Sequence, residues 1–336
     1  MHQINRAYPL RFEPVFRRYL WGGRRLASIL GRKLGPGDDY AESWDVVDRG
    51  ADQSIVADGP WRGRSLAELV AQQSGELFGR QPAPARFPLL LKYLDAQRDL
   101  SVQVHPDDAR AARLEPPDLG KTEAWVIVAA EPGSVIYTGL KPGVDRRQFQ
   151  QAVAAGRTVD CLHRWEPRVG DCIFIPAGVV HALGAGLLVA EIQQASDTTF
   201  RLYDWDRLDA HGRPRPLQVA EALEAIDYHC GPARAQVPQP TDRPHVRQLV
   251  SSDKFVLDRW SLDSAQLVGG DDRFHILSVL GGAVEVAGDP TGRPLKLGDT
   301  ALIPSGCGPV AILPHGPADL LDIYLPWPAG VGAARG

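Results

Sequence analysis

Short apolar runs alternate along the chain with segments rich in glycine and proline, of which it has 34 and 28. Residues 87–94 form a continuous apolar run with Lys92 embedded in it, which predicts a buried strand. Residues 100–105 alternate between apolar and polar positions, as a strand with one buried face does. Residues 124–130 and 171–176 are further apolar runs of strand length. The pattern predicts a mainly β chain with many tight turns.

A few segments have helical features instead. Ser65 and Glu68 have the spacing of a capping box, and apolar residues follow them at helical intervals. Three other short helices are predicted, at residues 107–114, 145–155 and 217–226. The expected fold class is therefore mainly β with a few helices.

One segment of the chain occurs twice. Residues 169–178 match residues 297–306 almost position for position. In both copies Gly-Asp and Pro-x-Gly are turn signals on either side of an apolar strand, and two longer apolar strands precede each copy. Two related β-sandwich or jelly-roll units would produce this repeat. In the second copy, Pro309 stands at the position that matches His181.

Composition excludes some classes of function. The chain has 336 residues, 44% of them hydrophobic and 23% charged, and a formal net charge of −4. These values are typical of a globular protein and disfavour nucleic-acid binding. No apolar run approaches the roughly 20 residues of a membrane span. The first residues lack the apolar core of a secretory signal, so we expect a cytoplasmic protein that does not contact membranes.

Three of the predicted segments carry side chains that bind metals. Gln103 and His105 are two residues apart on one predicted strand, so both can face the same ion. Glu123 begins a second apolar run, and His181 follows a third after a turn. A ligand set of nitrogen and oxygen atoms without thiolate is typical of a catalytic zinc site with one open position. The sequence therefore predicts a metal-dependent enzyme that acts on a small, oxygen-rich molecule.

These segments resemble the type I mannose-6-phosphate isomerases, also called phosphomannose isomerases, in their short bacterial form. The Ser-x-Gln-Val-His-Pro motif at residues 101–106 and the Lys-Thr-Glu motif at residues 121–123 are highly specific to that family. The other segments that match are residues 19–23, 41–44, 90–95, 176–182 and 191–201.

The resemblance implies a cupin fold, one Zn²⁺ per chain and the interconversion of D-mannose 6-phosphate and D-fructose 6-phosphate through an enediolate. It places the zinc ligands on Gln103, His105, Glu123 and His181, and the family's active-site arginine on Arg201.

The chain departs from the long form of the family in two places. Only 57 residues separate Glu123 from His181, so the helical domain inserted there in the long form is absent. The long form also has a histidine shortly after the Ala-Glu-x-Trp motif, whereas Asp-Val-Val-Asp-Arg follows Trp44 here. A mechanism that relied on that histidine could not operate in this chain.

The remaining charged residues of these motifs suggest roles in catalysis and binding. Arg201 is expected to stabilise the enediolate or to hold phosphate, and Lys121 to act as a base or to pair with phosphate. The base itself stays open between Lys121, Asp197, Glu191 and a zinc-bound water. For Glu191 and Asp197 we favour an orienting role beside Arg201 or His181 over direct catalysis. The expected substrate-binding residues are Ser101, Lys92 and, from the position of a phosphate-binding lysine in the long form, Arg207.

Two domains are expected. Residues 1–235 form a catalytic cupin domain with the metal site, residues 245–328 a cupin-like β domain without metal, and residues 231–244, rich in Pro, Gln and Arg, a linker. The expected partner is a small sugar phosphate, and the chain is expected to be a monomer or a homodimer. Two other functions remain: a non-enzymatic sugar-binding or regulatory cupin, and an iron-dependent cupin oxygenase.

Overall fold

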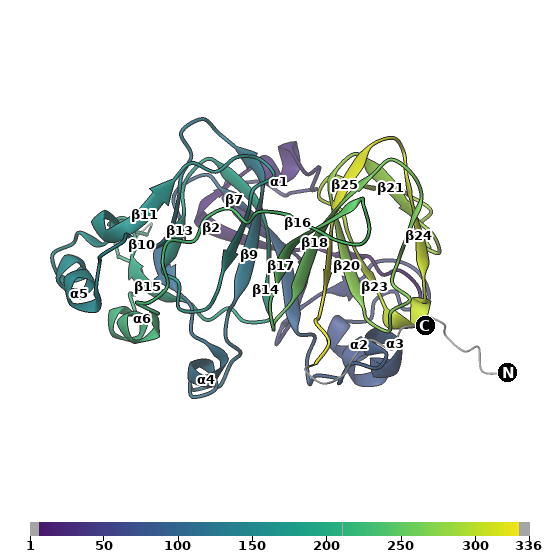
Figure 1. Ribbon diagram of the computed structural model, residues 1–336, viewed down its shortest axis with the longest axis horizontal. Helices are drawn as coiled ribbons and strands as arrows, with labels where there is room; N and C mark the ends of the chain where they lie inside the picture. The colour runs from purple at the N-terminus through teal and green to yellow at the C-terminus, as the bar shows by residue number, and fades with distance from the viewer. Residues whose placement is uncertain (1–6, 210, 329–336) are drawn as a thin grey trace.

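The computed structural model describes residues 7–209 and 211–328. Residues 1–6 and 210 of the predicted catalytic domain lie outside the described part. Two pairs of β-sheets stand side by side, with the helices outside the sheets (Figure 1). The prediction of a mainly β chain with a few helices is confirmed.

The first pair of sheets contains most of the predicted catalytic domain. Its six-stranded sheet has the order β12-β9-β14-β7-β3-β2, and its five-stranded sheet the order β11-β10-β13-β8-β15. Leu94 and Trp125 of the first sheet pack with Ile136 and Leu183 of the second, so an apolar core lies between the sheets. The strands are β2 (Val15–Gly23), β3 (Tyr40–Val46), β7 (Leu89–Ala96), β8 (Val102–Val104), β9 (Glu123–Ala130), β10 (Ile136–Leu140), β11 (Leu162–Trp165), β12 (Cys172–Ile175), β13 (His181–Leu183), β14 (Leu187–Gln194) and β15 (Phe200–Tyr203).

The second pair of sheets is formed by the C-terminal part of the chain. One sheet has the order β16-β17-β18-β25-β20-β23 and the other the order β19-β24-β21-β22. Trp260, Leu277 and Val284 belong to the core between them. The strands are β16 (Gln239–Pro240), β17 (Val246–Ser251), β18 (Val256–Leu262), β19 (Gln266–Val268), β20 (His275–Gly281), β21 (Ala283–Val286), β22 (Leu295–Lys296), β23 (Thr300–Ile303), β24 (Val310–Pro314) and β25 (Ala318–Tyr324).

The two pairs of sheets share one strand order. The order β12-β9-β14-β7 in the first pair matches β23-β20-β25-β18 in the second, and β11-β10-β13-β8 matches β22-β21-β24-β19. The repeated segments at residues 169–178 and 297–306 supply β12 and β23, which are equivalent edge strands. The internal repeat seen in the sequence therefore corresponds to a repeated topology.

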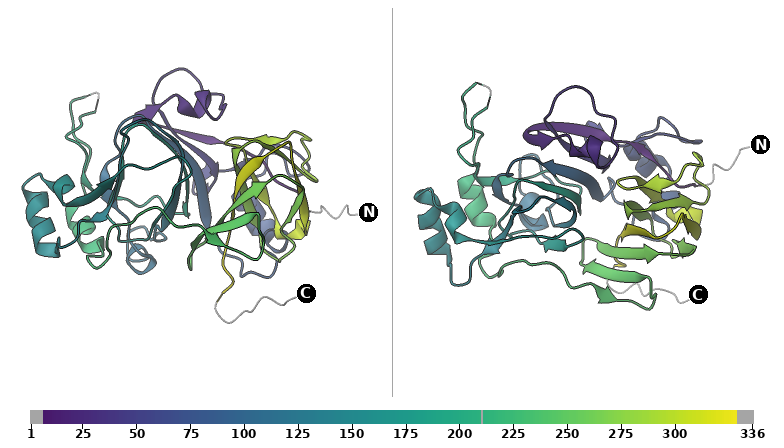
Figure 2. Two further views of the ribbon diagram at one scale, coloured as in Figure 1. Left: turned by 45° about the horizontal axis from the view of Figure 1, so that its top comes forward. Right: turned by 90° about the horizontal axis from the view of Figure 1, so that it is seen from above.

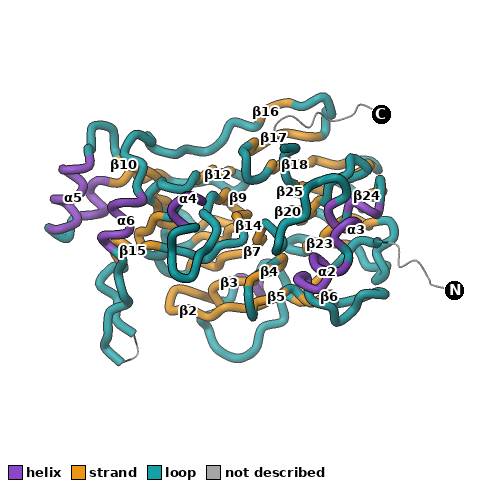
Figure 3. The backbone as a smooth tube through the Cα atoms, turned by 90° about the horizontal axis from the view of Figure 1, so that it is seen from below, coloured by secondary structure: helices purple, strands orange, loops and turns teal. Residues whose placement is uncertain are grey.

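The outer faces of the two six-stranded sheets pack against each other. Leu91 of β7 and Ile192 of β14 share a core with Leu257 of β18 and Ile323 of β25. Figure 3 shows β7, β14 and β9 beside β18, β25 and β20, and Figure 2 shows the same contact from two other sides. Such face-to-face packing of sheets buries alternate residues of each strand in a core that the two units share.

The helices are short and lie outside the sheets. Ser65 caps α2 in a capping box with Glu68, as predicted, and Asp145 caps α5 in the same way. The helices are α1 (Arg25–Ser28), α2 (Leu66–Gln72), α3 (Ser74–Phe78), α4 (Asp108–Ala111), α5 (Arg146–Ala154) and α6 (Val219–Ala225), with 3₁₀ turns η1 (Thr158–Cys161) and η2 (Ser305–Cys307). Two small ladders pair β1 (Phe12–Glu13) with β6 (Ile55–Val56), and β4 (Asp48–Arg49) with β5 (Asp52–Gln53). None of the described helices is long and apolar enough to cross a membrane.

N-terminal residues also contribute to the second unit. Leu10 forms a β-bridge with Leu302, and the ring of Phe78 at the end of α3 lies 5.9 Å from that of Phe274. The predicted linker at residues 231–244 lies partly along the first unit, where Gln236 donates a backbone hydrogen bond to Cys172. The division into domains at this linker stays a prediction.

Candidate metal centre and pocket

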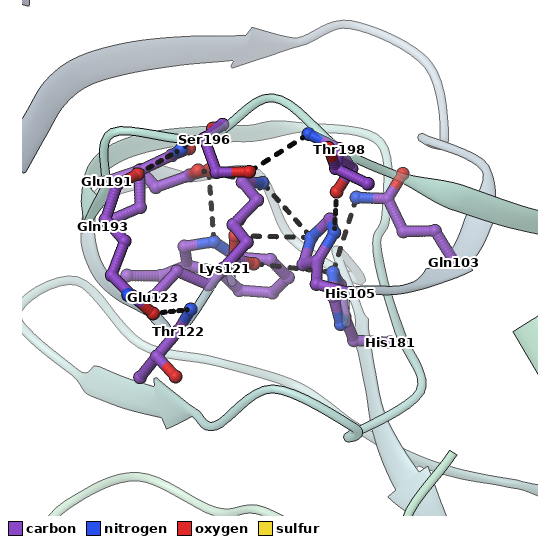
Figure 4. Close-up of polar contacts among 12 residues, drawn as sticks. Gln103, His105, Lys121, Thr122, Glu123, His181, Glu191, Gln193, Ser196 and Thr198 are labelled. Carbon is purple, nitrogen blue, oxygen red and sulfur yellow. Dashed lines mark hydrogen bonds and ion pairs between the residues drawn. The ribbon is translucent and has the colours of Figure 1, made fainter. Parts of the chain in front are cut away.

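Neighbouring strands bring the four predicted metal ligands together (Figure 4). Gln103 on β8 lies directly opposite His181 on β13. His105 follows β8 with the same orientation as Gln103, since alternate residues of an extended chain share a face. Glu123 begins β9 on the facing sheet. The two-residue spacing that suggested a common face for Gln103 and His105 thus corresponds to a real convergence.

The donor atoms of three of these residues form a compact group. Nε2 of His105 lies 3.4 Å from Oε2 of Glu123, and Nε2 of His181 lies 3.3 Å from Oε1. All three donors lie within 4.8 Å of one another, and all three residues are buried. Among residues 7–209 and 211–328, no other group of three or more His, Cys, Asp or Glu side chains converges in this way.

The surroundings of the two histidines set their protonation. Nδ1 of His105 bonds to the carbonyl of Thr198 and Nδ1 of His181 to that of Val179, each at 2.9 Å. These contacts place the proton on Nδ1 and leave the lone pair of Nε2 directed at Glu123. Burial lowers the pKa of His105 to about 3, helped by Lys121, and burial also lowers the pKa of His181. Both rings are therefore neutral near pH 7, as metal ligands must be.

Glu123 supplies the negative charge of the group. Burial alone would raise its pKa, but Lys121 and the two histidines hold the pKa well below its ordinary value. Oε2 of Glu123 pairs with Nζ of Lys121 at 2.7 Å. Two neutral imidazoles and an ionised carboxylate match the preferences of a divalent metal ion.

The fourth predicted ligand needs one adjustment. The amide of Gln103 directs Nε2 toward His181, at 3.3 Å, and Oε1 toward the hydroxyl of Ser101, at 3.1 Å. A metal ion would bind Oε1, and rotating the amide by about 180° exchanges the two atoms. Ser101 can accept as well as donate a hydrogen bond, so it fits either orientation.

Two buried lysines and Glu191 lie next to the histidine–glutamate group. Nζ of Lys121 lies 3.1 Å from Nε2 of His105 and 3.5 Å from Oε1 of Glu191. Nζ of Lys92 lies 3.4 Å from the same oxygen of Glu191 and 3.5 Å from Glu42. Burial raises the pKa of Glu191 to about 7, assisted by repulsion from Glu123 and opposed by the two lysines. Near neutral pH this carboxyl can therefore both take up and release a proton.

Gln103 and Lys121, which contact the histidine–glutamate group, line a polar pocket, whereas His105, Glu123 and His181 are not themselves among its lining residues. Lys92, Glu191 and Arg201 also line this pocket. The remaining lining residues are Tyr19, Trp21, Glu42, Leu94, Leu100, Ser101, Trp125, Leu183, Asp197, Thr199 and Arg215. Most of the predicted site residues thus face one cavity.

Arg201 lies next to a predicted metal ligand. It stands on β15 directly opposite Gln103 on β8. Its Nε is buried and has no hydrogen-bond partner among the described residues. Burial lowers the pKa of Arg201, and the nearby charge of Arg215 lowers it further, although arginine stays protonated at neutral pH.

The chain is similar to known isomerases along most of its length. It is 36% identical over 301 residues to the mannose-6-phosphate isomerase ManA of Bacillus subtilis (strain 168), covering 89% of this chain and 94% of that protein. It is 32% identical over 299 residues to the mannose-6-phosphate isomerase of Streptococcus mutans, covering 89% and 93%. The model of the type I phosphomannose isomerase catalytic domain matches residues 10–124. The chain belongs to the type I phosphomannose isomerase family.

Solved structures agree with this assignment. The crystal structure of mannose 6-phosphate isomerase from B. subtilis superposes with a TM-score of 0.85 at 32% identity, covering 95% of this chain and 100% of that one. A putative mannosephosphate isomerase from Archaeoglobus fulgidus superposes with a TM-score of 0.74 at 20% identity, covering 96% and 99%, a likeness of fold alone. The structural relatives support the cupin-like fold predicted from the sequence.

In this member of the phosphomannose isomerase family, Asp118 positions His105 indirectly, through Thr198. Its carboxylate accepts hydrogen bonds from Thr198 Oγ1 at 2.8 Å and Ser196 Oγ at 3.0 Å, and from Arg86 at 2.8 Å. The carbonyl of Thr198 in turn accepts the Nδ1–H of His105. Sequence reasoning missed Asp118, because it lies in an irregular segment without a motif.

The three predicted substrate-binding residues differ in their surroundings. Ser101 and Lys92 line the pocket, whereas Arg207 is not among the lining residues. The guanidinium of Arg207 bonds to Asp204 and to the carbonyl of Asp99. Its predicted role in binding substrate stays a prediction.

Two further pocket residues had no role assigned from the sequence. Arg215 lies in a loop without any recognisable motif, so no sequence signal marked it. Glu42 lies within the family segment at residues 41–44, which did mark its position but not its contact with Lys92.

Proposed function

We propose that this protein interconverts D-mannose 6-phosphate and D-fructose 6-phosphate. The observation that carries the proposal is the convergence of His105, Glu123 and His181 next to a pocket lined with lysine and arginine, in a chain of this family. The names of the relatives from B. subtilis and S. mutans support the same reaction. Metal donors beside a pocket whose lining includes Lys92, Lys121, Arg201 and Arg215 fit a substrate that carries a carbonyl and a phosphate.

The proposed cofactor is one zinc ion held by Gln103, His105, Glu123 and His181. When bound, zinc supplies a Lewis acid that polarises the carbonyl of the sugar. The Nζ atom of Lys121 contacts two of the donor atoms, so it would have to leave them when an ion binds. Glu191 is a second partner for Lys121 on the pocket side.

The reaction requires a proton to move from C2 of mannose 6-phosphate to C1. A base removes the C2 proton, the C2–H electron pair forms the C1–C2 double bond, and the carbonyl pair moves to O1. The hydroxyl proton passes from O2 to O1, and protonation at C1 with formation of a carbonyl at C2 yields the ketose. Lys121 and Glu191 are joined in one buried cluster, and the pKa of Glu191 near 7 suits a group that takes a proton and returns it. Asp197 also lines the pocket and stays a candidate. Arg201, beside Gln103, would stabilise the charge of the enediolate.

Other properties are predictions from the sequence. These are the cytoplasmic location, the monomeric or homodimeric state, and the division into residues 1–235, a linker at 231–244 and residues 245–328.

The test is a coupled assay that measures fructose 6-phosphate formed from mannose 6-phosphate, with free mannose alongside. We expect turnover of the phosphorylated sugar, loss of activity with a chelator, and recovery with Zn²⁺. Metal analysis and an assay without oxygen separate this proposal from an iron oxygenase, which would lose activity without oxygen. Tight sugar binding without turnover in the zinc-loaded protein would instead indicate a binding module.

A further inference from the structure

Two arginines, Arg201 and Arg215, line the same pocket. Arg201 makes no ion pair among the described residues, and its buried Nε has no partner. Arg215 lines the same pocket and is close enough to lower the pKa of Arg201. Two guanidinium groups on one pocket wall repel each other, so this arrangement is stabilised when an anion lies between them.

Arg215 is held in place by a buried carboxylate. Its Nε and Nη2 donate to the two oxygens of Asp204, at 2.8 and 2.7 Å. This bidentate contact uses one edge of the guanidinium and leaves Nη1 free of a hydrogen bond to the described residues. The side chain of Arg215 keeps 27% of its surface exposed, whereas that of Asp204 keeps 7%.

A turn next to Asp204 fixes this carboxylate. Trp205 and Asp206 have positive φ angles of 57° and 52°, which residues other than glycine rarely adopt. Trp205 Nε1 donates to the carbonyl of Leu100 at 2.7 Å, and Arg207 bonds to Asp204 and to the carbonyl of Asp99. The turn is thereby tied to the chain just before β8. Strained turns are kept where surrounding contacts support them, often beside functional sites.

We propose that Arg215 is a substrate-binding residue that contacts the phosphate group of the sugar phosphate, with Asp204 as its positioning residue. This inference rests on the proposed function of the pocket. Arg207 also pairs with the carboxylate of Asp204 but is not among the residues that line the pocket. Its role is therefore to stabilise the turn. The pocket lining contains four basic side chains, those of Lys92, Lys121, Arg201 and Arg215, and three acidic ones, those of Glu42, Glu191 and Asp197. The excess positive charge complements a phosphate dianion.

The test compares Arg215→Met with Arg213→Met. Arg213 lies two residues earlier in the same loop, its side chain is 71% exposed, and it pairs only with Asp209 among the described acidic residues. In Arg215→Met we expect KM for mannose 6-phosphate to rise about 10- to 100-fold, as for loss of a hydrogen bond to a charged group, with kcat nearly unchanged. Arg213→Met should match the wild type. Arg215→Lys should recover part of the affinity, because it restores the charge but not the planar fork.

A binding measurement separates this inference from the proposed reaction. Titration calorimetry with inorganic phosphate should show weaker binding to Arg215→Met than to the wild type and Arg213→Met. If the protein shows this difference in phosphate binding but has no isomerase activity, the phosphate-binding role of Arg215 stands and only the proposed reaction is rejected. Equal phosphate affinity in wild type and Arg215→Met, or no phosphate binding to the wild type, would overturn the inference. Circular dichroism checks that Arg215→Met is folded. We expect a folded variant, because Arg207 remains paired with Asp204.

Discussion

His275 stands in the C-terminal unit at the position that Glu123 has in the first unit. Glu123 begins β9 and is paired with Ile175 of β12, while His275 begins β20 and is paired with Ile303 of β23. The strands β12 and β23 come from the two copies of the repeated segment. The repeat thus preserved the strand positions but changed the side chains at the site.

The equivalent position in the second unit has become an ion-pair cluster. Nδ1 of His275 lies 2.8 Å from Asp322 and Nε2 lies 3.1 Å from Asp271, so both nitrogens of the ring contact carboxylates. Asp258 and Tyr324 complete the buried surroundings. This arrangement stabilises an imidazolium ion, whereas an imidazole that binds a metal must be neutral. The absence of a metal from the second unit stays a prediction.

Replacement of His181 by Ala should remove metal binding. Because the lost imidazole is a ligand itself, we expect metal affinity to fall by more than about 100-fold, beyond the effect of losing a supporting residue. Metal analysis and isomerase assays measure the change, and added Zn²⁺ should not restore the wild-type rate. His275→Gln is the matched control and should keep one metal ion per chain. Full activity of His181→Ala with unchanged metal content would remove His181 from the proposed ligand set.

Replacement of Arg201 by Ala should lower kcat by about 10²- to 10³-fold, by analogy with the loss of an oxyanion donor. The reason is that a cation on the enediolate stabilises the transition state more than the substrate. Arg201→Lys should recover activity only in part. Steady-state kinetics with metal analysis decide the role. A higher KM with nearly unchanged kcat would instead assign Arg201 to phosphate binding, and wild-type kinetics would exclude it from the site.

Replacement of Asp118 by Asn should weaken metal binding without removing a ligand. The change disturbs the contacts that position Thr198, whose carbonyl fixes the ring of His105. Loss of such a supporting residue costs about 10- to 100-fold in metal affinity. Competition with a chromophoric chelator measures the dissociation constant. Asp253→Asn, at a side chain that is 80% exposed, is the control. An unchanged dissociation constant in Asp118→Asn would contradict the supporting role.

The cluster around His275 should make stability depend on pH. Burial would lower the pKa of His275, but Asp322 and Asp271 outweigh it and raise the pKa to about 9. The folded-state pKa lies above the ordinary 6.5, so this stabilisation is complete below about pH 6.5 and is lost as the pH rises to about 9. The shift corresponds to on the order of 3 kcal/mol.

Thermal unfolding across that range measures the effect. We expect the melting temperature of the wild type to fall from about pH 6.5 to about pH 9 more steeply than that of His275→Gln, which carries no ionisable ring. Asp258 and Arg273 also face His275. Because the pKa of Asp258 is raised to about 6, its titration falls mostly below the range from pH 6.5 to 9. If the melting temperatures of the two proteins changed with pH in parallel, His275 would not be the group that makes stability depend on pH.

The sequence indicated the strand pattern, the internal repeat and the four candidate metal ligands. These features are local: alternation places Gln103 and His105 on one face, and turn signals mark the ends of strands. The capping box at Ser65 was visible for the same reason, since it depends on residues only three apart. The resemblance to a family then joined segments whose contacts lie far apart in the sequence.

Only the tertiary structure showed which side chains from distant segments meet. Arg215 reaches the pocket because Asp204 holds it there, and Asp118 supports His105 through Thr198. Neither residue lies in a periodic pattern or a motif, and an arginine or aspartate in a loop is usually an exposed residue. The pKa of Glu191 likewise depends on burial and on charges from three strands and a loop, which only the folded chain brings together. Local sequence determined the elements, and long-range packing decided the electrostatics of the site.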